Sequence, residues 1–461
     1  MPWGGTRPID ADDQTVQGPK AAQGSRRNDV DSSRRRFVGL CLAAPVLASD
    51  GTLTSAQRSD ASTTWPSVFP ALRQSLNGRP LTYLDSAATT LRPQSVIDAL
   101  VQYYSLDNAN PSRVHTLASR AADHLAAARQ TVARFINAAD SSEIVFVRGT
   151  TEGVNLVASA WGPTNLRGGD EIVLSIAEHS SNLMPWTRLA RARGADVRVV
   201  DVTDEGRLEP QAVRKALSTR TRIVALTHVS NVLGAVNPIK EICAQAHAAG
   251  ARVVVDGAQG VPHVKIDVRD LGCDFYIFSG HKMLGPMATG VLWGRRELLD
   301  SMPPYHVGSN MAHAVEFDHA EFEHGAQRFQ AGTPDVAGPV GLAAAIRFFE
   351  VAGNDALSRH DQALVRHGLE QLAGVPRLRL IGPRSADNRV PVFTFVIEGR
   401  TPMNVARALD EQGIAVRAGD MAAMPLLKRF GAAEAIRASA YVYSTQQDID
   451  RLADALHGIG K

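Results

Sequence analysis

One lysine in the chain follows a buried strand in a way that suits covalent chemistry. The stretch 273–286 begins with apolar, β-forming residues and ends in the polar turn Ser279-Gly280-His281-Lys282. A lysine just past a hydrophobic strand can be partly desolvated, and desolvation lowers the pKa of its amine and makes it nucleophilic. Lys282 is therefore a candidate for Schiff-base formation with a carbonyl compound.

A carboxylate upstream of this lysine supplies a second group of the same chemistry. The apolar, β-branched run 251–255 ends in Asp256, and Gly257-Ala258-Gln259 follow. An Asp at the carboxyl end of a buried parallel strand faces the crevice at that edge of the sheet. Pyridoxal phosphate needs a Lys that holds its aldehyde as an imine and an acid that pairs with its pyridinium nitrogen. Asp256 and Lys282 together predict a pyridoxal-phosphate site.

Other polar residues stand after predicted strands and would meet the same edge. Thr150 and Thr151 open a helix, where free backbone N–H groups and the helix dipole favour the cofactor phosphate. His179 can stack on the pyridine ring and shuttle a proton. We place Gln259 on the phenolic oxygen of the cofactor, and Asn231 near that oxygen and the substrate carboxylate.

Together these motifs resemble the class V aminotransferase superfamily, and above all the group II cysteine desulfurases and selenocysteine lyases. The resemblance runs from about Tyr83 to the C-terminus. It rests on the segments 279–282, 256–259 and 148–153, the last of which reads Arg-Gly-Thr-Thr-Glu-Gly. It implies an α/β protein of PLP fold type I, with a mainly parallel seven-stranded sheet in a large domain and a small α+β C-terminal domain.

The resemblance also implies roles for further residues. Ser279 and His281 are implied phosphate donors, and His115 matches an active-site histidine. Arg437 occupies the position of the arginine that binds the substrate carboxylate, which a guanidinium can bind through two hydrogen bonds. Arg417 is a second candidate for the substrate. The implied substrate is a small amino acid.

A homodimer is also implied, with its cofactor site completed by the neighbouring subunit. The segment Gly332-Thr333-Pro334 is expected to lie near that junction.

The segment after Arg417 departs from the family pattern. In the family a loop here carries a cysteine that takes sulfur from the substrate, whereas Ala422 stands at that place in Asp420-Met421-Ala422. A methyl group can neither attack sulfur nor store a persulfide. We therefore favour a transaminase or lyase without persulfide chemistry. A cysteine desulfurase or selenocysteine lyase that releases sulfide or selenide directly, and a non-catalytic PLP-binding protein, remain alternatives.

Strands and helices that alternate along the chain must position these groups. Short β-forming runs and helical stretches of about ten residues follow one another from residue 141, which indicates βαβ units and a mainly parallel sheet. A long helix is expected over 334–353, and short strands over 378–381, 392–397 and 415–417. The expected organisation is an N-terminal region over 1–56, a linker and arm over 57–80, a PLP-binding domain over 81–345 and a small domain over 346–461.

Composition is that of a soluble globular protein. The chain has 461 residues, a net charge of +2 and 44% hydrophobic residues, so we expect no nucleic-acid partner. Of its three cysteines, Cys243 and Cys273 are expected to be buried thiols. Four histidines between residues 306 and 324 lack the spacing of metal ligands, and we expect no metal.

The N-terminal region resembles an export signal. Arg34 and Arg35 precede an apolar run over 37–48, which is too short to span a bilayer and suits a signal peptide. The arginine pair resembles a twin-arginine signal, so the expected partner is the twin-arginine translocase. Residues 1–32, which precede this signal, are expected to be disordered. The protein is expected to be periplasmic or secreted, without a stable membrane anchor.

Overall fold

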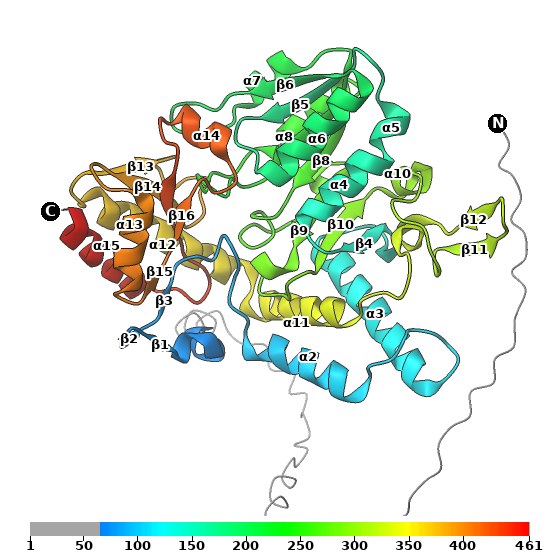
Figure 1. Cartoon of the computed structure of the whole chain (residues 1–461), viewed down its shortest axis with the longest axis horizontal. Coiled ribbons are helices and arrows are strands. Elements are labelled where there is room, and N and C mark those ends of the chain that lie inside the picture. The colour runs from blue at the N-terminus through cyan, green and yellow to red at the C-terminus, as the bar shows by residue number, and fades with distance from the viewer. Residues whose placement is uncertain (1–64, 461) are drawn as a thin grey trace, which may run out of the picture. The chain divides into compact units, whose positions relative to one another are not determined.

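The computed structural model describes residues 65–460 (Figure 1). The predicted disordered region and signal peptide, residues 1–56, lie outside the described residues, as does the first part of the predicted linker, up to residue 64. None of the helices between residues 65 and 460 has the length and apolar character needed to cross a bilayer.

A seven-stranded sheet forms the framework of the larger part of the fold. Its strand order is β4-β10-β9-β8-β7-β5-β6, in which β5 to β9 pair in parallel and β10 is antiparallel to both of its neighbours. This confirms the predicted α/β class and the mainly parallel sheet of seven strands. The strands are β4 (Ile144–Val147), β5 (Glu171–Ser175), β6 (Asp196–Val200), β7 (Thr221–Thr227), β8 (Arg252–Asp256), β9 (Phe275–Ser279) and β10 (Gly290–Gly294).

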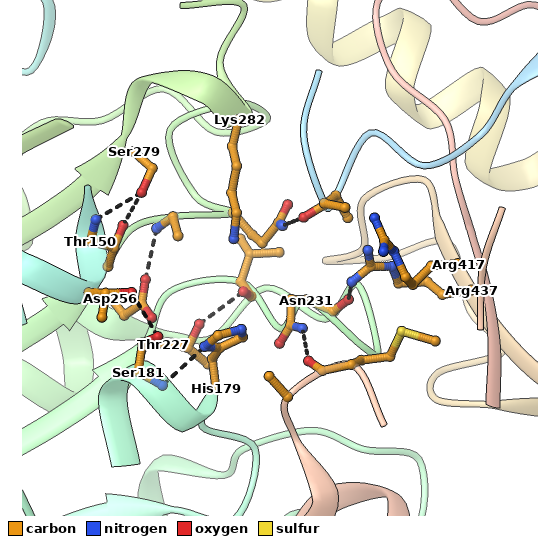
Figure 2. Close-up of a pocket in the computed structure, with 18 of the residues that line it drawn as sticks. Thr150, His179, Ser181, Thr227, Asn231, Asp256, Ser279, Lys282, Arg417 and Arg437 are labelled. Carbon is orange, nitrogen blue, oxygen red and sulfur yellow. Dashed lines mark hydrogen bonds between the residues drawn. The ribbon is translucent and has the colours of Figure 1, made fainter. Parts of the chain in front are cut away.

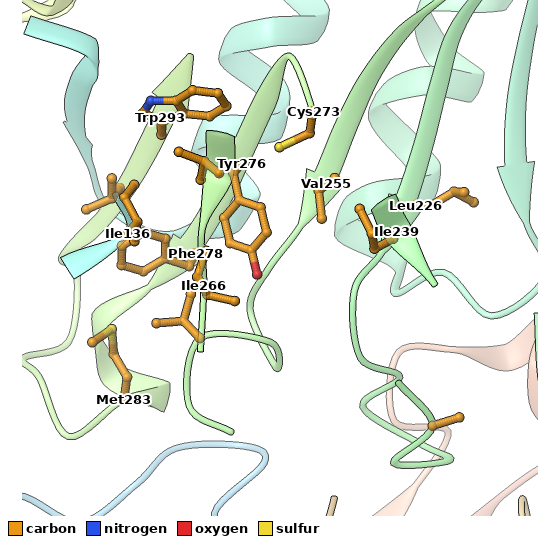
Figure 3. Packing of buried hydrophobic residues seen from close by; sticks show 14 of the residues in the cluster. Ile136, Leu226, Ile239, Val255, Ile266, Cys273, Tyr276, Phe278, Met283 and Trp293 are labelled. Atoms are coloured by element: carbon orange, nitrogen blue, oxygen red, sulfur yellow. The ribbon is translucent and has the colours of Figure 1, made fainter. Parts of the chain in front are cut away.

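Helices cover both faces of this sheet, which explains why its strands read as continuous apolar runs. Val254 and Ile277 pack with residues of α4 and α6, whereas Val255 and Phe278 belong to the cluster on the opposite face, with residues of α8 and α11 (Figure 3). The helices that precede the C-terminal part are α2 (Gln94–Leu106), α3 (Thr116–Phe135), α4 (Thr150–Ala160), α5 (Gly162–Asn165), α6 (Ser180–Arg193), α7 (Pro210–Ala216), α8 (Ile239–Ala248), α9 (Val268–Leu271), α10 (Arg296–Ser301) and α11 (Ala337–Ala352).

A second, four-stranded sheet lies in the C-terminal part, with the antiparallel order β13-β14-β17-β16. The single strand expected over 415–417 is wrong: the structure has two short strands, 414–415 and 417–419, because the chain pairs with a different strand before and after residue 416. Ile414 and Ala415 pair in parallel with Thr82 and Tyr83, and the next strand pairs with β17 instead. The elements are α12 (Asn354–Ala373), β13 (Leu378–Ile381), β14 (Val392–Ile397), α13 (Pro402–Asp410), β15 (Ile414–Ala415), β16 (Arg417–Gly419), α14 (Met424–Arg429), β17 (Ala435–Ser439) and α15 (Gln446–Gly460).

The residues before α2 are attached to the C-terminal part of the chain. Strand β3 (Thr82–Tyr83) pairs with β15, and Asp85 forms an isolated bridge with Ser439. Two smaller pairs complete the fold: β1 (Ser75–Leu76) with β2 (Arg79–Pro80), and β11 (Ala312–Val315) with β12 (Ala320–Phe322). The predicted domain limit at residues 345 and 346 falls inside α11, and it stays a prediction.

Candidate active site

Polar residues from several strand ends meet around one cavity of about 500 Å³ (Figure 2). The cavity lies where parallel strands end and the following segments begin, which is the usual ligand position in such sheets. All but one of the predicted site residues line it. They are Thr150, Thr151, His179, Asn231, Asp256, Gln259, Ser279, His281, Lys282, Arg417 and Arg437.

Lys282 and Asp256 form the charged centre of the cavity. Asp256 ends β8, is 4% exposed and accepts a hydrogen bond from the Ala258 N–H at 2.9 Å. Burial raises the pKa of its carboxyl group, and the ammonium of Lys282 opposes that rise. Desolvation lowers the pKa of Lys282 to about 8, although the Asp256 carboxylate favours the charged amine. The amine is therefore far more nucleophilic at neutral pH than an ordinary lysine.

The segment that carries Lys282 is held in place by residues far away in the sequence. The carbonyl oxygen of His281 accepts hydrogen bonds from the Thr90 N–H at 2.9 Å and from the Thr89 hydroxyl at 3.1 Å. Gln259 is held from the same side, since its side-chain amide donates to the Ala87 carbonyl at 2.6 Å. The segment 87–90 therefore fixes one wall of the cavity.

One end of the cavity offers donors for an anion. Thr150 is the first residue of α4, and both its N–H and its hydroxyl lie 2.8 Å from the Ser279 hydroxyl. The Nδ1 atom of His281 is buried without a hydrogen-bond partner, and desolvation lowers the pKa of this imidazole to about 4. Thr150, Ser279 and His281 also line a neighbouring cavity of about 450 Å³. A helix N-terminus with hydroxyl and imidazole groups suits a phosphate.

His179 lies beside the charged centre as a neutral imidazole. It caps α6, and its Nδ1 accepts a hydrogen bond from the Ser181 N–H at 3.1 Å. Desolvation, together with the positive charges of Lys282 and Arg437, lowers its pKa to about 4. The preceding Glu178 is buried and accepts a hydrogen bond from the Asn182 amide at 2.7 Å. Burial raises the pKa of Glu178 to about 8. Its hydrogen bond with Asn182 makes this carboxyl a structural support that the sequence had not indicated.

Two arginines and an amide line the opposite side of the cavity. Arg437 lies on β17 and is 3% exposed, and its Nη1 donates to the backbone carbonyl of Asn231 at 3.1 Å. The Asn231 side-chain amide donates to the Met421 carbonyl at 2.9 Å. Arg417 is half-exposed, and its Nη2 lies 2.6 Å from a carboxylate oxygen of Asp85. Sequence reasoning missed Asp85, since an acidic residue after a two-residue strand carries no signal of its own.

The loop that carries Ala422 is attached to the start of α6. The Ala422 carbonyl accepts hydrogen bonds from the N–H and the hydroxyl of Ser180, at 2.7 and 2.8 Å. Asp420 Oδ1 accepts a hydrogen bond from the Ala422 N–H at 2.9 Å. Met421 and Ala422 both have a φ of 53°, a conformation that costs a non-glycine residue roughly 1 kcal/mol. These contacts keep Ala422 on the cavity wall.

The cysteines and His115 lie elsewhere. Cys243 and Cys273, the two cysteines in the described part of the chain, are free thiols buried in the core, as predicted, and neither lines the cavity. The structure does not bring His115 to this cavity: it is exposed and caps α3, where its Nδ1 accepts from the Ala118 N–H at 3.3 Å. Its role in an active site stays a prediction.

Comparison with known proteins gives the family. The model of the class-V aminotransferases matches residues 82–452, so the chain belongs to that family. A cysteine desulfurase of Dickeya dadantii is 47% identical over 393 residues, 85% of this chain and 95% of that protein. A cysteine desulfurase of Synechococcus elongatus is 46% identical over 85% of this chain, which spans 62% of that relative's length.

Solved structures of similar proteins have the same fold as this chain. The cysteine desulfurase CsdA of Escherichia coli superposes with a TM-score of 0.80 and 37% identity, over 86% of this chain and 97% of CsdA. A C-DES mutant with glycine covalently linked to its PLP cofactor shares the fold, with a TM-score of 0.73 and 23% identity over 85% of this chain and 98% of that one.

The match over residues 82–452 confirms the predicted family, and PLP, the predicted cofactor, is present in the C-DES structure that shares the fold. The residues of this chain fit that group. An amine with a lowered pKa suits its aldehyde, a buried carboxylate suits its ring nitrogen, and the unpartnered His281 Nδ1 beside the start of α4 suits its phosphate. The individual roles of these residues stay predictions.

The lowered pKa of Lys282 can be tested directly in the apoprotein. Trace acetylation with acetic anhydride between pH 6 and 11, followed by peptide mapping, should give a labelling midpoint near pH 8 for Lys282, because only the neutral amine reacts. A lysine model peptide in the same samples gives the reference midpoint, at the ordinary lysine value of about 10.4.

Asp256→Asn should move the Lys282 midpoint to lower pH, because the Asp256 carboxylate stabilises the ammonium form. A Lys282 midpoint equal to that of the model peptide, or a midpoint that rises in the Asp256 variant, would contradict this electrostatic account.

Proposed function

We propose that this protein is a pyridoxal-phosphate enzyme that cleaves the Cβ–sulfur bond of a cysteine-type amino acid and releases the sulfur as sulfide. The proposal rests on the 47% identity to a cysteine desulfurase and on a cavity wall that carries Ala422, at the position where the family resemblance implies a cysteine. Selenocysteine, with the better leaving group, is the second candidate substrate.

The chemistry divides between the cofactor and the chain. Pyridoxal phosphate, when bound, supplies an electron sink for negative charge at the substrate Cα. Lys282 provides the amine for covalent attachment and can take the Cα proton, since its pKa of about 8 suits proton exchange at neutral pH. Arg437 binds the substrate carboxylate, and the neutral His179 can exchange a proton with the reacting atoms.

Between residues 65 and 460 no cysteine lines the cavity, and the products that we propose follow from this. In elimination the Cβ–S bond breaks, and its electron pair leaves with the sulfur as HS⁻ while the Cα proton passes to a base. Water then converts the three-carbon remainder to pyruvate and ammonium, so no oxidant or reductant is needed. Transfer of neutral sulfur to form alanine needs an attacking thiolate instead, and neither Cys243 nor Cys273 reaches the cavity.

The two alternative functions, a transaminase and a non-catalytic PLP-binding protein, have less support. A transaminase would keep the sulfur on its substrate, whereas the relatives at 46% and 47% identity are cysteine desulfurases. A non-catalytic PLP-binding protein would need Lys282 for its cofactor, but it has no need of a buried guanidinium such as that of Arg437 for a substrate carboxylate.

The purified holoprotein should convert L-cysteine to sulfide and pyruvate in equal amounts, without persulfide on the protein. Sulfide, pyruvate and alanine are measured together, and Lys282→Ala is the inactive control. Alanine as the main product, or a keto acid that retains its sulfur, would refute the elimination.

Ala422→Cys provides the complementary test. The change adds one sulfur atom on the cavity wall, and alanine and cysteine meet the same strain at a φ of 53°. Part of the product should then shift from pyruvate to alanine, with persulfide on the new thiol. The shift should be small, because the carboxylate of Asp420 disfavours the thiolate, and Asp420→His in the same chain should increase it.

We propose that the protein acts as a homodimer through a face that includes α2. This helix exposes Val101 and Tyr104, which lie three residues apart on one face and have exposed fractions of 59% and 61%. Neighbouring apolar side chains of this size on one face are typical of an interface.

Sedimentation should therefore give a dimer for the wild type, and a monomer or a weakened dimer for Tyr104→Glu. Val351→Glu, at an apolar site that is 89% exposed on α11, is the control and should stay dimeric. A wild-type monomer would refute the proposal.

We also propose export by the twin-arginine route, on the strength of Arg34 and Arg35 before the apolar run 37–48. Replacing both arginines with lysine keeps the charge and should retain the full-length protein in the cytoplasm of a host with this translocase. Equal export of the double variant, measured by fractionation, would exclude this route.

A further inference from the structure

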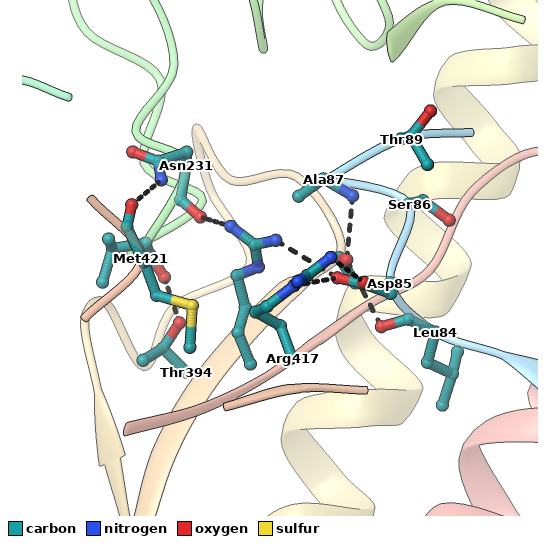
Figure 4. A network of polar contacts seen from close by, with 12 residues as sticks. Leu84, Asp85, Ser86, Ala87, Thr89, Asn231, Thr394, Arg417 and Met421 are labelled. Carbon is teal, nitrogen blue, oxygen red and sulfur yellow. Dashed lines mark hydrogen bonds and ion pairs between the residues drawn. The ribbon is translucent and has the colours of Figure 1, made fainter. Parts of the chain in front are cut away.

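Asp85 binds the two arginines that line the substrate side of the cavity. Its Oδ2 lies 2.6 Å from Arg417 Nη2, and its Oδ1 lies 3.3 Å from Arg437 Nη2 (Figure 4). Asp85 is 8% exposed and Arg437 3% exposed, so solvent screens their pairing little. One carboxylate therefore serves two guanidinium groups at the edge of the cavity.

The sheet makes such a counterion necessary. Arg417 on β16 and Arg437 on β17 are directly opposite each other in the antiparallel register. Like charges in directly opposite positions repel, and burial strengthens the repulsion. The negative charge of Asp85 compensates one of the two positive charges.

The main chain holds Asp85 in this position. The Ser439 N–H donates to the Leu84 carbonyl at 2.7 Å, and the Ser86 N–H donates to the Ser439 carbonyl at 3.2 Å. The Ser439 hydroxyl accepts a hydrogen bond from the Ala87 N–H at 2.9 Å. The carboxylate is therefore attached to the end of the strand that carries Arg437, and it cannot move far without breaking these bonds.

The arginines are left with one unit of positive charge. Arg417, Arg437 and Asp85 together sum to +1, and Arg437 retains a buried Nε without a hydrogen-bond partner. Asp420 also lines the cavity, but within the described residues it forms no salt bridge with either arginine. The carboxylate of one substrate would neutralise the remaining positive charge, whereas a second carboxylate on the substrate would have no positive charge to pair with.

We propose that Asp85 determines specificity: by pairing with Arg417 and Arg437 it leaves charge for one carboxylate, and so selects monocarboxylic amino acids over dicarboxylic ones. The inference deepens the proposed function by naming the substrate class, and it rests on that function only in taking an amino acid as the ligand. Asp85 acts through the arginines and is therefore a positioning residue.

The test compares the binding of two sulfur-free ligands to the holoenzyme. L-alanine carries one carboxylate and L-aspartate two, and their dissociation constants are measured from cofactor absorbance at low ionic strength. Asp85→Asn keeps the shape of the side chain and removes its charge. The ratio of the two dissociation constants should shift about tenfold in favour of L-aspartate, because the added positive charge attracts the dianion more strongly.

Two further variants distinguish the electrostatic effect of Asp85→Asn on binding from an effect of this substitution on the fold. Asp420→Asn removes the same charge from the cavity without breaking a pair with the arginines, and should shift the ratio less than about twofold. Arg417→Gln, at a half-exposed position, removes a positive charge and should shift the ratio in the opposite direction, towards L-alanine. This last variant keeps the test decisive if Asp85→Asn does not fold.

Three results would overturn the inference: an unchanged ratio in Asp85→Asn with both ligands weakened equally, an equal shift in Asp420→Asn, or no shift in Arg417→Gln. The first would mean that Asp85 only supports the fold. Because neither ligand contains sulfur, a failure to release sulfide from L-cysteine would count against the proposed function and leave these binding constants interpretable.

Discussion

The electrostatic interaction between a desolvated amine and a buried carboxylate is the constraint on which the active site depends. Asp256 ends β8 and Lys282 follows β9, and these neighbouring parallel strands bring both residues to the same edge of the sheet. Neither group is stable as an isolated buried charge, because desolvation raises the pKa of Asp256 and lowers that of Lys282. Each supports the charged form of the other, and this leaves an amine that is reactive at neutral pH.

The cavity is completed by segments that are distant in sequence. The segment 87–90 holds the backbone beside Lys282, and the loop with Ala422 is attached to the first residues of α6. Ser180, which holds that loop, directly follows His179, so the loop and the imidazole share one support. A change in the loop would therefore reach the imidazole as well as the substrate.

The substrate side shows a related balance of charge. Arg437 and Arg417 come from adjacent strands of the smaller sheet, and Asp85 comes from the start of the described chain. Asp85, which precedes the large sheet in sequence, and strands β16 and β17, which follow it, thus meet where a substrate carboxylate would bind. A buried guanidinium that keeps a carboxylate partner avoids most of the cost of an isolated charge.

The sequence by itself determined the strands and the residues that follow them. The strand over Val392–Ile397 was predicted with its observed limits, and the apolar run that ends in Asp256 forms β8, because a strand buried on both faces is largely apolar. Lys282, Asp256 and Thr150 were found for the same reason, since polar side chains directly after such strands must face the crevice.

Only the tertiary structure decided which distant groups meet. Asp85 and Arg437 are 352 positions apart, and β17, which carries the arginine, had not been predicted. The chain is divided into β15 and β16 because β15 pairs with Thr82 and Tyr83, whereas β16 pairs with β17. Local periodicity reports which face of a strand is buried, but long-range pairing and the compensation of buried charges depend on contacts that no local pattern encodes.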